Sequence, residues 1–571
     1  MNDRRPLIAI ALILVIAFIP SFFMDPPVRP DAVDNTPAST AATTGGGVES
    51  LAPPPALQAA PVVDSAISGG PIPGVPDDTV LVRSGLYEYG ISTRGGQIVS
   101  ARFLRYRTMH ADENRDTLQL LPVARPIMDA RLVVAGDTVR FDATQLTPNA
   151  SELTVSDGPA TLRMVGSVRG VGIELDYTFV PDDYRIHLEG RLTGIGSTGG
   201  TLLLGLGNGF RDTEANLAEN HREGGVVTKR DGTDLTRFSS LDPLVPEVLS
   251  GPFEWVAVKS KYFVAGLFSY DSTRVGSTGN IGGVLAIARD SLPEKPVRAE
   301  VRAGLLVSNA GTFNATLYLG PMEYDRLRAM GHDFDDVNPY GWPGFRTVIR
   351  PFAVAIRAIF VWMHETLGLH YGLAIVFFGV MIRVVLWPLN QKAMRSMTAM
   401  QAVQPELQAL QKKYKEDPAR LQQEMFKLYK EHKVNPFGGC WPMLLPYPFL
   451  VAVFFVLQNT IEIRGVGFLW MPDLSRPDPL FIIPVVMAVS MFGISKIGQL
   501  GMPPNPQAKM MMYVMPVMLG VLFLNFASGL NLYYAVQNLA SIPQQWLIMK
   551  ERQKLMAMKA KPQVEVKTKK G

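Results

Sequence analysis

Long apolar runs fill the last third of the chain and limit its possible folds more than any other feature. A helix that crosses a membrane needs about 20 mostly apolar residues. Five stretches meet this requirement, near 369–389, 440–459, 480–498, 508–526 and 530–549. The sequence therefore predicts a polytopic α-helical membrane protein, in which these five helices form a core over residues 369–549.

The N-terminus carries one further apolar run. Pro6–Met24 follows Arg4 and Arg5 and lacks a small-x-small cleavage pattern. We interpret residues 1–24 as an uncleaved anchor with its N-terminus in the cytoplasm, with a cleaved signal peptide as the alternative. Residues 25–78 are rich in Pro, Ala, Gly, Ser and Thr and contain no aromatic residue. Such a segment cannot bury a core and is expected to be a disordered linker.

A β-rich domain is predicted for residues 79–340. The runs Tyr87–Ser92 and Tyr184–Glu189 alternate side chains with a period of two, which is typical of half-buried strands. Arg94–Gly96 follows the first run and favours a hairpin turn. Short strands with Gly and Asp turns continue to about Leu319. This pattern predicts a large antiparallel β-sandwich.

The sequence shows no catalytic or metal-binding constellation. Cys440 is the single cysteine, which excludes an intramolecular disulfide and a cysteine-based zinc cluster. Histidines of the β-rich region lack metal-ligand spacing, and its clustered aspartates are interpreted as turn and capping residues; these are His110, His187, His221, His332, Asp182, Asp183, Asp333, Asp335 and Asp336. No GxxxxGK(S/T) phosphate loop occurs. We expect no enzyme activity, no cofactor, no metal and no ATP hydrolysis.

An interfacial helix is predicted for residues 345–366, just before the membrane core. Arg346, Arg350 and Arg357 fall on one narrow stripe of an otherwise apolar helix. A basic stripe on an apolar helix fits one that lies in the membrane interface. A further transmembrane helix is the alternative, but the three arginines and Pro351 argue against it.

The loop charges predict the topology. The net charge of +4 is too small to indicate nucleic-acid binding, so the distribution of charge matters more. Segment 390–439 has nine Lys/Arg against five Asp/Glu, and the tail 550–571 has eight against two. Loop 465–479 has Arg476 against Asp473 and Asp478. Because basic segments stay in the cytoplasm, we expect six spans, both termini inside, and the β-rich domain outside.

Arg383 interrupts the apolar stretch 369–389, about 9 Å from its cytoplasmic end at the helical rise. An arginine inside a span costs about 2.5–3.5 kcal/mol on insertion scales, so it normally faces a cavity or a partner. The alternative is that the side chain snorkels to the cytoplasmic headgroups. No Asp or Glu lies deep in the five stretches, so the sequence offers no carboxylate to neutralise this charge.

A polar stripe runs along the last span. Its members recur at helical spacing on one face: Asn531, Tyr534, Asn538, Ser541 and Gln545, widened by Gln537 and Gln544. Interhelical hydrogen bonding is the plain interpretation of such residues in a membrane. The length of the stripe and the unpaired Arg383 instead favour a wet groove that receives an anionic or polar guest.

Segment 390–439 is predicted to be a cytoplasmic helical hairpin. Asp417-Pro418 marks a helix start, and Asn435-Pro436 with Gly438-Gly439 marks a stop. Three methionines, which adapt to varied apolar partners, form a soft stripe: Met394, Met397 and Met400. The basic tail 550–571 could contact ribosomal RNA by phosphate attraction or serve only as a topology anchor.

Three motifs resemble the YidC/Oxa/Alb family of membrane protein insertases. They are Met381–Leu389 (MIRVVLWPL), Lys433–Cys440 (KVNPFGGC) and Ser528–Tyr534 (SGLNLYY). The anchor, the long linker and the β-rich domain resemble the Gram-negative form of the family. The resemblance covers nearly the whole chain. One position departs from it, since Gly379 stands where members often carry a hydroxyl residue one turn before the arginine.

The resemblance implies a five-helix insertase core around a hydrophilic groove in the bacterial inner membrane, with a β-supersandwich-like periplasmic domain. It implies insertion of nascent membrane proteins, alone or with the Sec translocon. The predicted groove residues are Arg383, Asn531, Tyr533, Tyr534, Asn538, Ser541 and Gln545. The predicted contacts for nascent chain or ribosome are Met394, Met397, Met400, Lys412, Lys413, Lys567, Lys569 and Lys570.

Two other functions remain open from the residues alone. A solute or ion transporter could use the same groove, although the lack of acidic partners and of an inverted repeat argues against it. A membrane-anchored sugar-active enzyme could use a large β-sandwich, but it would need convergent carboxylates or histidines.

Overall fold

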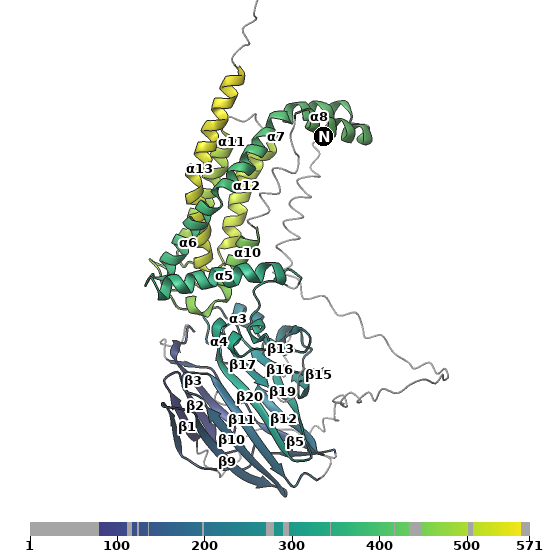
Figure 1. The fold of residues 1–571 in the computed structure, drawn as a ribbon, viewed down its shortest axis with the longest axis vertical. Helices are drawn as coiled ribbons and strands as arrows, with labels where there is room; N and C mark the ends of the chain where they lie inside the picture. Colours follow the sequence, from purple (N-terminus) through teal and green to yellow (C-terminus); the bar gives the residue numbers. More distant parts are fainter. Residues whose placement is uncertain are drawn as a thin grey trace, which may run out of the picture.

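A β-rich domain and a helical part make up the structure (Figure 1). The computed structural model describes residues 79–560 except 111–116, 123–124, 135, 197–198, 270–278, 289–295, 343, 416, 433–446 and 501–505. The predicted anchor 1–24, the linker 25–78 and the motif Lys433–Cys440 lie outside the described residues, as do Lys567, Lys569 and Lys570.

Three sheets build the β-rich domain. The five-stranded sheet has the order β4 (Thr117–Gln119), β3 (Ile98–Arg107), β2 (Tyr87–Ser92), β1 (Thr79–Ser84) and β8 (Glu152–Val155). The nine-stranded sheet has the order β14 (Thr233–Arg237), β13 (Gly225–Lys229), β16 (Trp255–Lys259), β17 (Phe263–Phe268), β20 (Thr312–Pro321), β11 (Arg185–Thr193), β10 (Val171–Phe179), β9 (Ala160–Val168) and β7 (Thr147–Pro148). The six-stranded sheet has the order β15 (Pro246–Phe253), β18 (Ile281–Ile287), β19 (Glu300–Val307), β12 (Gly200–Gly207), β5 (Ala130–Val134) and β6 (Asp137–Arg140).

The period-two runs form strands, as predicted. Strands β2 and β3 pair antiparallel, and the turn between them contains Gly95 and Gly96 at positive φ, which glycine adopts without steric cost. Tyr87 and Tyr89 are fully buried in one continuous core. The described ladders are antiparallel except for β1 with β8, which are parallel. The expected antiparallel arrangement is therefore wrong at this edge.

Short helices complete the β-rich domain: α3 (Leu217–Glu223), η1 (Phe238–Ser240), α4 (Tyr324–Ala329) and η2 (Phe334–Val337). The helical part contains α5 (Arg346–Glu365), α6 (Tyr371–Val385), α7 (Trp387–Lys413), α8 (Pro418–Glu431), α10 (Tyr447–Asn459), η3 (Ile461–Ile463), α11 (Ile482–Gln499), α12 (Pro506–Phe523) and α13 (Ser528–Ala560).

Two described helices are long and apolar enough to cross a membrane, α5 and α11. Shorter apolar helices span Tyr371–Val385, Pro448–Asn459 and Lys509–Phe523. Length and composition therefore do not establish six spans, which remain a prediction. Figure 1 shows α6, α11 and α13 standing along one direction, whereas α5 lies across their lower ends next to the β-rich domain. This orientation fits an interfacial helix better than a span.

The arginines of α5 bind carboxylates of the β-rich domain. Arg346 pairs with Asp336, and Arg350 pairs with both Asp335 and Asp336, the latter at 3.1 Å. The basic stripe was expected to face the membrane interface, and those aspartates were interpreted as turn and capping residues. Asp335 and Asp336 do lie in the first turn of η2, and the structure adds that their charges neutralise Arg346 and Arg350 and fasten α5 to the domain. These two arginines therefore face the β-rich domain, and the interfacial position of α5 remains a prediction.

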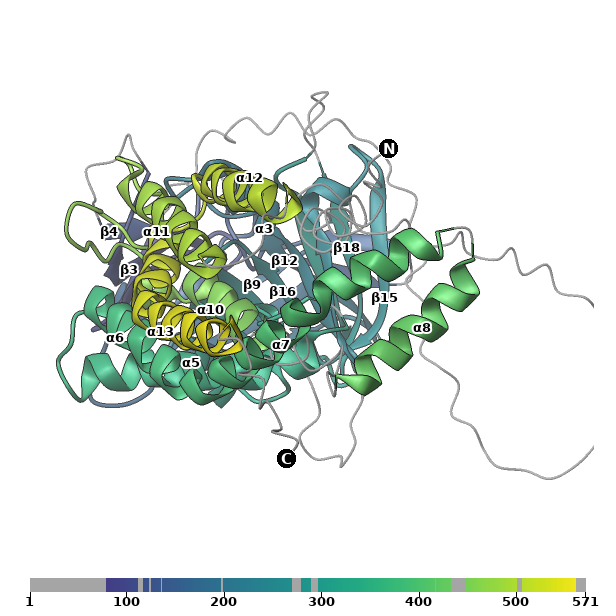
Figure 2. The same ribbon diagram turned by 90° about the horizontal axis from the view of Figure 1, so that it is seen from above.

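The helical part packs around α13. Helix α13 lies against α6 and α11, α12 packs on α11, and α10 packs on α5. Helices α7 and α8 form a hairpin at the end farthest from the β-rich domain (Figure 1), and Figure 2 shows this hairpin extending sideways from the other helices. Asp417 caps α8 by accepting a hydrogen bond from the backbone N–H of Arg420, with Pro418 in the first turn, as its sequence signal predicted.

Candidate functional site

Arg383 lies in the last turn of α6, where its positive charge is favoured by the helix dipole. The side chain is half-buried, and its Nε is buried without a hydrogen-bond partner. No ion pair of Arg383 occurs among the described residues. The structure therefore presents a charged group with unused hydrogen-bonding capacity within the helical part.

Contacts between α6 and α13 place Arg383 relative to the polar stripe. A Cβ on Gly379 would lie 3.1 Å from Val536 Cγ1, and Gln544 Nε2 donates to the carbonyl of Trp387 at 3.0 Å. Both pairs are offset by 157 positions, so the two helices run parallel in a fixed register. This register puts Arg383 at the level of residue 540, between Gln537 and Gln544.

Gly379 has a packing role at this crossing. Its lack of a side chain lets α6 approach Val536 and Tyr533 of α13, at 3.1 and 3.7 Å from the position of an added Cβ. Small residues allow this close approach of helices in membranes. The departure from the family pattern at Gly379 thus coincides with a tight helix contact.

The polar stripe of α13 does not face one common space. Asn531 is fully buried and donates to the carbonyls of Phe523 and Phe526 at 2.9 and 3.4 Å. Asn538 donates to the carbonyl of Met487 at 3.5 Å, and buried Ser541 donates to that of Asn538 at 2.7 Å. Asn531 and Ser541 are buried between helices and donate to backbone carbonyls, and the Oδ1 of Asn531 is buried without a partner. The groove interpretation is wrong for both residues, because neither side chain reaches an open space in this structure.

The neighbouring tyrosines of α13, Tyr533 and Tyr534, differ in how far they are buried. Tyr533 is fully buried, its hydroxyl accepts a hydrogen bond from Gln537 Nε2 at 2.8 Å, and its ring packs near Phe378. It is therefore a core residue and not a groove residue in this structure. Tyr534 is half-buried and meets the edge of the Phe523 ring. Gln545 is also half-buried.

Two polar side chains of α13 toward the α7–α8 hairpin were left out of the predicted groove residues: Gln544, which the sequence placed at the side of the polar stripe, and Arg552, which sequence reasoning missed. Gln544 is buried with its Oε1 unpaired, although its amide nitrogen is bonded. Arg552 is buried, donates to the carbonyl of Gly498 at 2.8 Å, and leaves its Nε unpaired. Arg552 follows Ser541 by three helical turns on the same face. Extending the stripe past residue 549 would have found it.

The predicted cytoplasmic contacts belong to α7. Met394, Met397 and Met400 lie within this helix. Lys412 and Lys413 are exposed in its last turn. Helices α7 and α8 enclose an open hollow of about 320 Å³ lined by Glu406, Ala409, Leu410, Lys413, Glu424, Lys427, Leu428 and Glu431. The hairpin thus offers a charged rim around a few apolar side chains.

A bundle of apolar helices joined to a large β-rich domain, with an arginine inside an apolar helix that has no counter-ion among the described residues, indicates a membrane protein. Residues 79–353 match the family described as the YidC periplasmic domain, and residues 362–555 match the family described as the 60Kd inner membrane protein. The chain belongs to the YidC family of membrane protein insertases.

Relatives named membrane protein insertase YidC match along the chain. The Chlorobaculum tepidum protein is 30% identical and covers 95% of this chain and 94% of its own. The Nitratidesulfovibrio vulgaris protein is 30% identical, with 96% and 100% covered. A YidC insertase crystal structure with the first transmembrane domain resolved is 18% identical, with a TM-score of 0.34, covering 83% of this chain and 93% of that one.

The family assignment decides among the functions left open by the sequence. The protein is an inner-membrane insertase with a periplasmic β-rich domain, and it is not an enzyme. The insertase prediction is confirmed, whereas the transporter and the sugar-active enzyme are not supported. A galactose mutarotase related enzyme from Lactobacillus acidophilus, 10% identical, has a TM-score of 0.26 and covers 42% of this chain and 97% of its own.

Proposed function

We propose that Arg383 is the electrostatic centre of a hydrophilic path along α6 and α13 that guides polar segments of nascent membrane proteins. The observation that carries this proposal is the half-buried guanidinium with no counter-ion among the described residues. An acidic group of a guest at 4 Å gains about 4 kcal/mol at an effective dielectric of 20, before desolvation. That gain is large enough to bias which segments enter.

The path that we propose uses fewer residues of α13 than the sequence predicted for the groove. It uses the half-buried residues Tyr534, Asn538 and Gln545 together with the unpaired Oε1 of Gln544. Because α6 and α13 run parallel with Arg383 level with residue 540, these groups follow one another toward the cytoplasmic end. The apolar segment of the guest then slides along the helices into lipid, driven by burial of its apolar surface.

We also propose the cytoplasmic steps. The α7–α8 hairpin receives the nascent chain through its methionines, and Lys412, Lys413 and the tail lysines Lys567, Lys569 and Lys570 attract ribosomal phosphates. Sec translocon components act beside the protein on larger clients. This scheme includes six spans with both termini in the cytoplasm. The positions of the hairpin and the β-rich domain at opposite ends of the helices support it (Figure 1).

A photo-crosslinker tests the path. It is placed at Tyr534 or Asn538 in the full chain, and ribosomes stalled on a short membrane protein are supplied. We expect crosslinks to the nascent chain at both positions. Phe377, which is exposed on another face of α6, serves as the control position and should crosslink to lipid more than to client. Equal client crosslinking at Phe377 and absence at Asn538 would contradict the path.

A further inference from the structure

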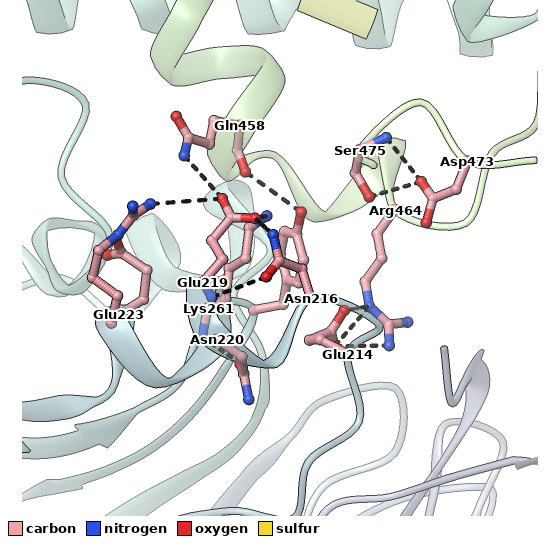
Figure 3. Close-up of polar contacts among 12 residues, drawn as sticks. Glu214, Asn216, Glu219, Asn220, Glu223, Lys261, Gln458, Arg464, Asp473 and Ser475 are labelled. Atoms are coloured by element: carbon pink, nitrogen blue, oxygen red, sulfur yellow. Dashed lines mark hydrogen bonds and ion pairs between the residues drawn. The ribbon is translucent and has the colours of Figure 1, made fainter. Parts of the chain in front are cut away.

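The periplasmic domain and the helical part meet along a seam of buried charged side chains (Figure 3). Arg464, which follows η3, pairs with Glu214 of the periplasmic domain. The guanidinium Nε donates to both carboxylate oxygens at 3.0 and 2.9 Å, and one terminal nitrogen lies 2.8 Å from Oε1. Their side chains are only 2% and 8% exposed. The pair is thus taken out of water on both sides.

The remaining N–H groups of Arg464 also cross the seam. One terminal nitrogen donates to the carbonyl of Arg107 at 2.9 Å and the other to the carbonyl of Thr213 at 3.3 Å. Thr213 in turn donates its hydroxyl to Glu214 Oε1 at 3.0 Å. A planar fork that is used this fully fixes orientation as well as distance. Arg464 therefore binds two separate segments of the periplasmic domain at once.

Apolar side chains fasten the same segment, Thr460–Gly465, which we call the latch segment. Ile461 is buried in the core of the periplasmic domain, whereas Ile463 is buried in the core of the helices. Gly465 has a φ of +75°, and an added Cβ would collide with Met109 of the periplasmic domain. Two side chains only two positions apart thus belong to different cores, so the latch segment joins them.

A second polar row supports the seam beside the latch segment. Gln458, near the end of α10, donates to Glu219 at 2.9 Å, and Lys261 pairs with Glu219 at 3.0 Å (Figure 3). Burial opposes the charge of Lys261, but Tyr262 and Glu219 outweigh it and raise its pKa. Asn338 donates to the carbonyl of Asn459 at 3.2 Å. The end of α10 is therefore held at several points.

The loop between the latch segment and α11 also binds the first turns of α11 and α13, which we call the outer ends of these helices because they lie next to the periplasmic domain. The backbone N–H groups of Ser528 and Gly529, at the start of α13, donate to the carbonyls of Arg476 and Leu474 at 2.7 and 2.9 Å. Asp478, fully buried, accepts from the backbone N–H of Ile483 at the start of α11 at 2.8 Å. The loop after the latch segment thus caps both helices.

We propose that the Arg464–Glu214 pair is an interdomain latch that keeps the periplasmic domain, the latch segment and the outer ends of α10, α11 and α13 in one fixed arrangement. Opening the latch loosens those helix ends. The fixed outer end holds α13 in register with α6, and so keeps the polar groups of α13 next to Arg383. Insertion therefore depends on the latch, a step that rests on the proposed function.

Hydrogen exchange of the full chain in nanodiscs tests the latch. Arg464→Met leaves Glu214 buried and unpaired, and Glu214→Leu leaves Arg464 in the same state, whereas the double variant replaces the pair by apolar side chains. Breaking one partner of a buried pair is far more damaging than replacing both. We expect each single variant to raise exchange at 460–478 and at Ser528 and Gly529 at least about tenfold, and the double variant to exchange more slowly than either.

The control is Arg163→Met, which breaks an exposed pair with Asp176 far from the seam in sequence and should leave exchange at 460–478 and 528–529 unchanged. Unchanged exchange in both single variants overturns the latch. Faster exchange confined to the periplasmic domain overturns the coupling to α13. A double variant that equals the product of the two single effects shows that the pair does not act as a unit. If these single variants fail to fold, Glu214→Gln supplies the comparison, because it keeps the shape of the side chain and removes only the charge that pairs with Arg464. Wild-type exchange in Glu214→Gln overturns the latch.

Insertion of one client is measured in parallel. We expect the single latch variants to lose most insertion although Arg383 is intact. Fast exchange with normal insertion shows that the latch fixes the helix ends, and it overturns the claim that insertion depends on the latch. If Arg383→Ala inserts clients normally but the latch variants do not, the proposed path fails and the latch stands.

Discussion

Arg464 at the outer end of the helices and Arg383 near the other end carry the same charge in opposite surroundings. Arg464 is almost fully buried and directs its N–H groups at one carboxylate and two carbonyls. Arg383 is half-buried, its Nε has no partner, and no carboxylate pairs with it among the described residues. Arg464 has therefore used its hydrogen-bonding groups within the protein, whereas Arg383 still has an N–H group and a charge that a guest could pair with.

This difference separates a structural charge from a charge that can act on a guest. A buried ion pair whose hydrogen bonds are satisfied fixes geometry but has no capacity left for a ligand. Buried polar atoms without a partner occur at both ends of the helices. Arg357 and Arg464, next to the periplasmic domain, pair with carboxylates, whereas Arg383 and Arg552, nearer the α7–α8 hairpin, pair with none among the described residues. We infer that the outer end of the helices stays closed, and that the end near the α7–α8 hairpin receives the polar segment of a guest.

The largest effect is expected from removing the outer arginine. Arg464→Ala strands the carboxylate of Glu214 in a buried site, and breaking such a pair costs about 3–5 kcal/mol. Arg383→Ala removes a charge without stranding a partner and should leave stability nearly unchanged. Thermal unfolding of both variants in detergent checks the contrast. Equal loss of stability in the two variants would erase the distinction between the arginines.

A smaller loss is expected at the α6–α13 crossing. Gly379→Leu forces a side chain against Val536 and Tyr533, and overpacking costs about 1–3 kcal/mol. Gly379→Ser is the matched control, since its hydroxyl methylene needs a shift of only a few tenths of an ångström at the 3.1 Å contact. Unfolding in detergent should rank serine close to the wild type and leucine well below it. The reverse ranking would mean that α6 and α13 do not meet as described.

A still smaller change is expected at Asn531. Replacing it by leucine removes hydrogen bonds to the carbonyls of Phe523 and Phe526, and such bonds within membranes contribute about 0.6 kcal/mol on average. Insertion should remain near normal, because the side chain is buried away from the path. A severe insertion defect with unchanged stability would show that Asn531 belongs to the path after all.

The smallest effect is expected on the outer surface of the periplasmic domain. Asp176→Asn breaks its pair with Arg163, which is exposed, and exposed pairs contribute little to stability. Neither the unfolding temperature nor insertion should change measurably. A clear insertion defect here would show that the comparison between the two arginines omits a functional surface.

The sequence predicted what depends on local pattern. The period of two predicted the hairpin of β2 and β3, and the basic apolar stretch 345–366 predicted α5, which runs from Arg346 to Glu365. Asp417-Pro418 predicted the start of α8. In each case the signal lies within a few residues, so no knowledge of distant neighbours is needed.

The sequence could not predict which neighbour covers a given face. Helical period placed Asn531 and Asn538 on one stripe, but the carbonyls that they reach belong to different segments. The partner of Arg464 lies 250 positions away at Glu214, and the pairs between Arg350 and the aspartates of η2 link a helix to a domain interpreted separately. Such contacts arise only from the tertiary arrangement.

Client insertion with a matched pair of substrates tests the central claim most directly. One client carries an acidic translocated segment, and the other has its Asp and Glu replaced by Asn and Gln. We predict that Arg383→Ala lowers insertion of the acidic client much more than that of the neutral one, and that Arg383→Lys restores most of the difference. An equal loss for both clients, or no loss for either, would contradict the role of Arg383 as the charge that attracts the guest.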